Sequence, residues 1–94
     1  MSAVAWIVST IANEAVLGSP ANPKRKSHTA INKTPTDANY GYSSRVATSG
    51  ANEGLPLTAN GGSIIEGEPG VYKGEIWVIA ASAIDLNFAE VSED

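Results

Sequence analysis

One histidine and a few carboxylates are the residues in this sequence that could do chemistry. His28 follows the cationic run Lys24–Lys26 and Ser27, and neighbouring cations in a polar stretch favour a surface side chain over a general base. A catalytic imidazole also needs groups that orient it. The chain contains no cysteine, which excludes thiol nucleophiles and thiolate metal sites. We therefore expect a protein that is not an enzyme and that uses no cofactor and no metal.

The best pair of carboxylates by sequence is Glu66 and Glu68, which together with Asp85 could bind a cation or a small ligand. The pair lies in Ile65–Gly70, where two glycines and a proline indicate a turn, and no calcium-loop spacing accompanies it. Two solvated carboxylates are the simpler interpretation. The segment Gly61–Ser63 lacks the lysine of a phosphate-binding loop and is typical of a turn before a strand.

Charged and aromatic residues are better suited to binding than to catalysis here. The basic cluster, Lys24–Lys26 with Lys33 and Arg45 further on, could contact phosphate or an acidic protein surface. The net charge of −4 favours the protein surface, and nucleic acid is not expected as a partner. Tyr40 and Tyr42 would place both rings on one face of an extended segment. Trp6 and Trp77 lie in apolar stretches, which indicates core or a subunit interface. The candidate interface residues are Trp6, Lys24, Arg25, Lys26, Tyr40, Tyr42, Arg45 and Trp77.

The length and the charge distribution favour one small domain that associates with other chains. A chain of 94 residues fits a single domain, 1–94, and without disulfides its thin core would gain stability from neighbouring subunits. Residues 1–50 carry a net charge of +3 and residues 51–94 a net charge of −7. The two halves could face each other in neighbouring subunits, or they could simply be two solvated faces.

The first two segments are the harder ones to interpret. Residues 1–18 are apolar and fit either a short helix with one apolar face or a buried strand, and the helix is favoured because Gly18 and Pro20 would end it. The unbroken apolar run Ala3–Val8 is too short to span a membrane, so no membrane partner is expected. Residues 19–62 are rich in proline, asparagine and glycine, which predicts a long irregular arm, either disordered or laid across another subunit.

The last third has the clearest pattern. Residues 63–89 contain β-forming runs between turn sequences, and Ile84, Leu86 and Phe88 alternate with polar residues at period two. An acidic tail, 90–94, would end the chain in solvent. The expected fold is mainly β: a small antiparallel β-sandwich or barrel-like domain built from the C-terminal third, with the long arm and the N-terminal helix or strand attached.

The segment Gly70–Leu86 resembles small bacteriophage virion proteins, in which a lysine-glycine turn leads into an aromatic and hydrophobic strand. The resemblance implies a capsid decoration or cement protein, made in the host cytoplasm and located on the capsid surface. Its expected partners are the major capsid protein or other virion subunits, and it is expected to form a homo-oligomer, with a trimer favoured. A head-fibre or tail-associated virion protein is the close alternative.

A different class of function also fits the sequence. The chain could be a small adaptor module whose basic arm becomes ordered on an acidic partner. That alternative predicts a monomer with a mobile arm. It differs from the virion hypothesis, which predicts oligomers or assembly on a shell.

Overall fold

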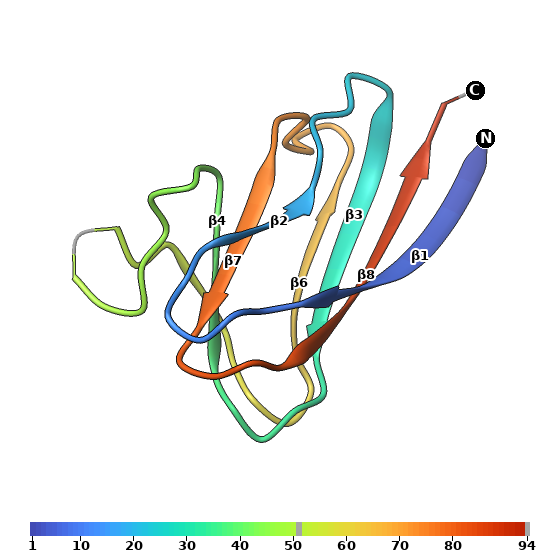
Figure 1. Ribbon diagram of the computed structural model, residues 1–94. Coiled ribbons are helices and arrows are strands. Elements are labelled where there is room, and N and C mark those ends of the chain that lie inside the picture. The colour runs from blue at the N-terminus through green and yellow to red at the C-terminus, as the bar shows by residue number, and fades with distance from the viewer. Residues whose placement is uncertain (51, 94) are drawn as a thin grey trace.

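The computed structural model describes residues 1–50 and 52–93, and these residues form eight β-strands and no helix (Figure 1). In chain order the strands are β1 (Ser2–Ser9), β2 (Val16–Ser19), β3 (Arg25–Asn32), β4 (Ala38–Gly41), β5 (Leu55–Leu57), β6 (Gly62–Gly67), β7 (Ile76–Ala80) and β8 (Asp85–Ser92). The expectation of a mainly β chain is confirmed.

The strands form two antiparallel sheets of four strands each. The first sheet has the order β1-β8-β3-β6 and the second sheet the order β2-β7-β4-β5, so the chain changes sheet at almost every connection. Both sheets contribute side chains to one hydrophobic core, from β1, β3 and β8 on one side and from β4, β5 and β7 on the other. The first and last strands, β1 and β8, lie side by side in the first sheet, where Ser2 pairs with Ser92 (Figure 1).

The helix favoured for residues 1–18 is wrong, since this segment forms strands β1 and β2. The β-branched residues that also suggested a strand alternate sides, so that Val8 is buried in the core while Ile7 is exposed. A tight turn with a bridge between Ile11 and Glu14, and with Asn13 at φ 60°, separates the two strands.

The irregular arm predicted for residues 19–62 is also wrong, because strands β3, β4 and β5 lie within it. Strand β3 was not predicted because several of its inward-facing residues are polar: Arg25, His28 and Asn32 are all buried. An alternation of apolar and polar residues therefore does not mark this strand. Pro56 is compatible with β5 because β5 lies at the edge of the second sheet.

The C-terminal third follows the prediction more closely. Strands β6, β7 and β8 form where β-forming runs were found, and Leu86 and Phe88 point into the core while Asp85 is exposed. The acidic tail is wrong at its start, because β8 continues to Ser92 and Glu90 makes an ion pair inside the fold. Asp94 lies outside the described residues.

Candidate interaction surface

Arg25 was predicted to lie on an interface but is fully buried between the two sheets. Its Nε donates to Glu90 Oε2 at 2.6 Å, Nη1 donates to the carbonyls of Tyr72 and Gly74, and Nη2 donates to the carbonyl of Pro20. The guanidinium therefore joins three segments of the chain, and every contact is internal. Arg25 is used to hold the fold together and is not available to a partner in this state.

The basic residues on either side of Arg25 remain at the surface, as expected. Lys24 is exposed, and Lys26 forms an ion pair with Glu93 at 3.1 Å in which both side chains are partly exposed. Arg45 is exposed in the connection between β4 and β5, beside a hollow that also includes Asn52. The predicted basic cluster is thus divided among different parts of the molecule.

A chain of hydrogen bonds links four side chains through the buried His28, whose predicted position at the surface is wrong. His28 Nε2 lies 2.7 Å from Ser19 Oγ, and Nδ1 lies 3.4 Å from the Tyr40 hydroxyl. Tyr40 donates its hydroxyl hydrogen to Glu66 Oε2 at 2.7 Å, so His28 Nδ1 donates to Tyr40 and Nε2 accepts from Ser19. Ser19 therefore donates to His28, His28 donates to Tyr40, and Tyr40 donates to the Glu66 carboxylate.

Burial keeps His28 neutral. Desolvation, followed by the charge of Arg25, lowers the pKa of His28 from 6.5 to about 4, although the carboxylates Glu90 and Glu66 act in the opposite direction. Burial and the hydrogen bond to Glu66 raise the pKa of the Tyr40 hydroxyl well above its ordinary value. For the half-exposed Tyr42, whose hydroxyl also bonds Glu66, burial and the Glu66 charge raise the pKa to about 12.

A serine that donates to a histidine resembles the start of a catalytic triad, but this pair has no access to a substrate. Ser19 and His28 are both 0% exposed. Within the described residues, every buried side-chain nitrogen and oxygen has a hydrogen-bond partner. Glu66 belongs to the same network, since it also accepts from the Tyr72 backbone N–H, so its prediction as a solvated carboxylate is wrong. The arrangement stabilises the packing of the two sheets.

The aromatic candidates are distributed between the core and the surface. Tyr40 and Tyr42 do lie together, with ring centroids 5.8 Å apart, but Tyr40 is fully buried and only Tyr42 is exposed. Trp6 is half-buried against the core and its Nε1 donates to the Gly18 carbonyl, which ties β1 to β2. Trp77 is half-buried on the second sheet, with Nε1 directed to Glu75. Whether Trp6, Tyr42 and Trp77 contact a partner stays a prediction.

The outer face of the first sheet is a surface that sequence reasoning did not single out. The register places side chains in three successive rows across the four strands, and none of them is charged. The rows are Ile7, Asn87, Ile31 and Ser63; then Ala5, Ala89, Thr29 and Ile65; then Ala3, Val91, Ser27 and Gly67. Isoleucines border small residues, and Ile65 is 73% exposed. The face is therefore uncharged, with isoleucine side chains beside alanines and small polar residues.

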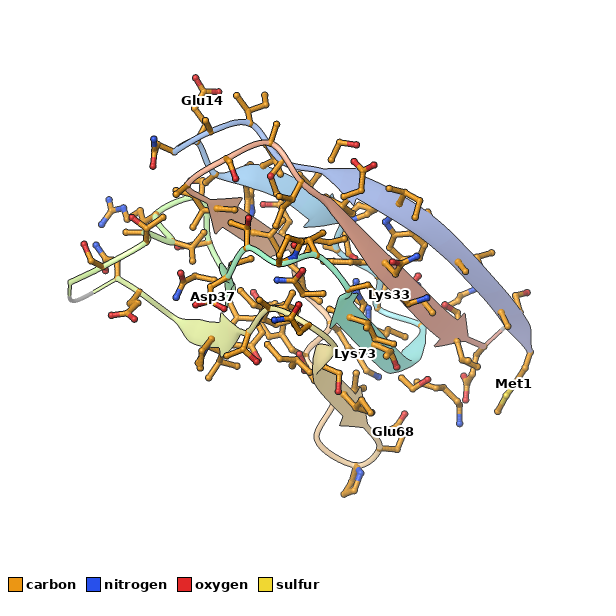
Figure 2. The ribbon with its side chains drawn as sticks, turned by 90° about the horizontal axis from the view of Figure 1, so that it is seen from below. Met1, Glu14, Lys33, Asp37, Glu68 and Lys73 are labelled. Carbon is orange, nitrogen blue, oxygen red and sulfur yellow. The ribbon has the colours of Figure 1, made fainter. Side chains whose placement is uncertain are left out.

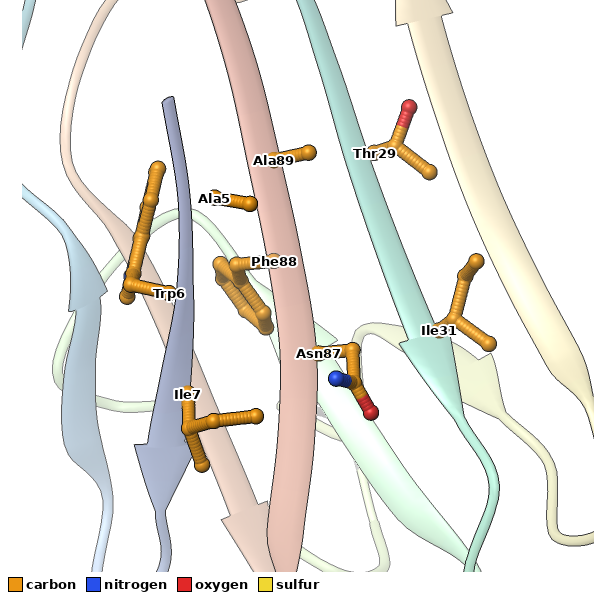
Figure 3. A pocket seen from close by; sticks show the side chains of 8 residues that line it. All are labelled: Ala5, Trp6, Ile7, Thr29, Ile31, Asn87, Phe88 and Ala89. Carbon is orange, nitrogen blue, oxygen red and sulfur yellow. The ribbon is translucent and has the colours of Figure 1, made fainter.

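A shallow hollow of about 290 Å³ opens on this face where the small residues lie (Figure 3). Ala5 and Ala89 form its middle, and Ile7 and Ile31 border it. Many charged side chains lie instead on the turns and loops: Figure 2 labels Glu14 before β2, Asp37 before β4 and Glu68 after β6. The sequence signal for this face was that the odd-numbered residues from Ala3 to Ser9, which lie on one side of an extended strand, are all uncharged.

Comparisons of the chain with family models, with curated proteins and with solved structures find no match. The described part of the chain holds no cluster of three or more histidine, aspartate or glutamate side chains that could bind a metal ion. The described residues form no helix that is long and apolar enough to cross a bilayer.

Proposed function

We propose that this chain is a non-enzymatic structural protein of a bacteriophage virion, which binds the capsid surface as a cement or decoration subunit. The observation that carries the proposal is the strand order, β1-β8-β3-β6 in one sheet and β2-β7-β4-β5 in the other. We take this arrangement as a β-sandwich of the jelly-roll kind, in which eight strands form two linked Greek keys. Viral capsid domains are a frequent use of this architecture, together with lectins and cupins.

The fold alone does not fix a function, so the surfaces carry part of the argument. Cupins use their architecture to hold metals or ligands, whereas the histidine of this chain lies in a closed hydrogen-bond network. The uncharged outer face of the first sheet suits contact with a protein surface better than contact with nucleic acid, which requires positive charge. These features support a role based on occupying surface.

The mechanism that we propose is mechanical. A small domain with one broad uncharged face would cover the junctions between shell subunits, and burial of the apolar side chains on that face would add to the free energy that opposes outward movement of the shell. The partners would be the major capsid protein or other virion subunits. The same surfaces would also serve a head-fibre or tail-associated protein, and the trimer implied by the resemblance remains a prediction.

The adaptor alternative has lost its main support. It relied on a mobile basic arm that becomes ordered on an acidic partner, but Arg25 and Lys26 lie within strand β3 and Arg25 is fully buried. An adaptor that uses a preformed surface would still be compatible with this fold. The virion hypothesis and this alternative differ in where the protein accumulates.

Location of the protein in virus particles tests the proposal directly. Particles induced from the source culture would be banded on a density gradient, and the chain would be quantified by mass spectrometry and located by immunogold labelling. We expect the chain in the particle band, in constant ratio to the major capsid protein, with label on the shell. Recovery only in the soluble fraction would contradict the proposal.

A further inference from the structure

We infer that the outer edge of β1 is a self-association site at which two copies of this chain join their first sheets through antiparallel β1–β1′ pairing. The inference concerns this chain alone and does not depend on the virion role. It begins from the position of β1 at the edge of the first sheet, where β8 is its only neighbouring strand among the described residues. Figure 1 shows β1 as the outermost strand on that side, running alongside β8 towards the termini.

The backbone of β1 has hydrogen-bonding groups directed away from β8. The Thr10 N–H donates to the Ile84 carbonyl, and the register pairs Ser9 with Asp85, so the residues that bond β8 are the even-numbered ones. By alternation, the N–H and C=O groups of Ala3, Ala5 and Ile7 point to the outer side of the strand. They form a row of donors and acceptors that matches an added strand.

The other sheet edges have features that block such pairing, and β1 has none of them. Strand β5 has three residues and contains Pro56, β2 has four residues and a register irregularity between Leu17 and Ser19, and β6 carries Glu66 between terminal glycines. Strand β1 has eight residues without charge, proline or glycine, and it pairs with β8 in continuous register. An exposed edge of this kind is a template for another strand.

A second copy fits this edge because β1 complements itself about Ala5. When Ala5 lies opposite Ala5′, Ile7 lies opposite Ala3′, so a bulky side chain faces a small one at each outer pair. Ile7 is 55% exposed and Ala3 is exposed as well, so these side chains are open to a partner. Since β1 contains no charged residue, the two-fold arrangement brings no like charges together.

The pairing would create one sheet of eight strands with β1 and β1′ at its centre. The uncharged outer faces of both first sheets would then be continuous, which doubles the uncharged surface available to a larger partner. The charged side chain of Asp85, at the Ser9 end of β1, would lie at the margin of the junction, where water can reach it. The expected assembly is a closed dimer, in place of the trimer that the resemblance implies, because isologous pairing uses the same edge of both copies.

The mass of the full chain in solution is the first test. Light scattering coupled to size-exclusion chromatography should give twice the 9.7 kDa chain mass at high concentration and a monomer on dilution. Ala5→Pro removes an outward N–H and leaves the bonds to β8 in place, so it should weaken dimerisation at least tenfold while the circular dichroism spectrum is kept. The matched control, Ile65→Lys, changes an exposed residue in the same row at the opposite edge and should dimerise like wild type.

The register is tested by cross-linking, which needs only a single added thiol because the chain has no cysteine. In Ala5→Cys the two Cα atoms would be about 5.5 Å apart, within the range of a disulfide. In Ala3→Cys they would be about 13 Å apart along the strands, beyond that range. Oxidation should therefore cross-link Ala5→Cys, leave Ala3→Cys unlinked, and join Ala3→Cys to Ile7→Cys when the two variants are mixed.

The contrary results are equally specific. A monomer at every concentration, together with no cross-linking of Ala5→Cys, would overturn the inference. A trimer, or dimerisation abolished by Ile65→Lys and kept by Ala5→Pro, would overturn it in favour of a different contact. None of these outcomes bears on whether the chain is found in virus particles, so failure here is distinct from failure of the proposed function.

Discussion

The buried polar cluster and the β1 edge use hydrogen bonds in opposite ways. In the cluster around Arg25 and His28, the polar side chains bond other groups of the same chain. Arg25 bonds Glu90, and His28 bonds Ser19. At the β1 edge the strand offers a row of backbone groups to the outside. The polar groups of the first region hold the two sheets together, whereas the outward backbone groups of the second region can bond another strand. Stability and association should therefore respond to different substitutions.

The largest expected effect is the loss of the buried guanidinium. Arg25→Met removes the ion pair with Glu90 and leaves buried carbonyls without donors, so the free energy of unfolding should fall by about 3 to 5 kcal/mol. The adjacent Lys26→Met is the control, because its ion pair with Glu93 is partly exposed and should contribute less than about 1 kcal/mol. Urea unfolding curves measure both. Equal losses in the two variants would show that the cluster is not the stabilising region.

Acid should weaken the fold through His28 before it affects the β1 edge. The folded pKa of about 4 lies below the unfolded value of 6.5, so the unfolded chain binds the proton first and stability falls as pH decreases through this window. The loss attributable to His28 should be about 2 kcal/mol between pH 7 and pH 5. The measurement is the free energy of unfolding as a function of pH, and the loss is the difference in slope between wild type and His28→Leu. Identical slopes would mean that His28 titrates normally.

A smaller effect is expected from the hydroxyl that joins His28 to Glu66. Tyr40→Phe should lower the free energy of unfolding by about 1 to 2 kcal/mol, since the buried His28 and the partly buried Glu66 each lose a hydrogen bond. Tyr42→Phe is the matched control, because its exposed hydroxyl bonds Glu66 at 3.2 Å and water can replace it. Thermal unfolding compares the pair. A larger loss in the Tyr42 variant would contradict the proposed network.

A substitution at Ala5 should have the smallest effect on the free energy of unfolding and the largest effect on dimerisation. Ala5→Lys replaces an exposed side chain on the outer face, so monomer stability should stay within about 0.5 kcal/mol of wild type. Two lysines facing each other across the two-fold axis should nevertheless prevent dimerisation. Mixing Ala5→Lys with Ala5→Glu should restore a dimer. A mixture that stays monomeric would argue against position 5 as the centre of the junction.

The sequence indicated the strands whose apolar residues alternate and missed those whose buried residues are polar. The alternation of Leu86 and Phe88 predicted β8 well, whereas β3 was assigned to an irregular arm because Arg25 and His28 face the core. Partners that make such burial possible, such as Glu90 for Arg25, lie far away in the chain. Local patterns cannot supply that information.

The candidate surface was difficult to predict for a related reason. The interface residues chosen from the sequence were large aromatic and basic ones, and two of them, Arg25 and Tyr40, are needed inside the fold. The surface proposed here is formed by small residues such as Ala5, whose importance arises only from the register of neighbouring strands. Topology, rather than residue type, reveals that β1 is an edge.

Amide hydrogen exchange along β1 tests the central claim most directly, because it reports on individual backbone groups. The amides of Trp6 and Val8 bond β8 and should be protected at every protein concentration. Those of Ala5 and Ile7 should exchange rapidly in the dilute monomer and become protected as the dimer forms. Rapid exchange of Ala5 and Ile7 at concentrations where the mass is that of a dimer would contradict β1–β1′ pairing.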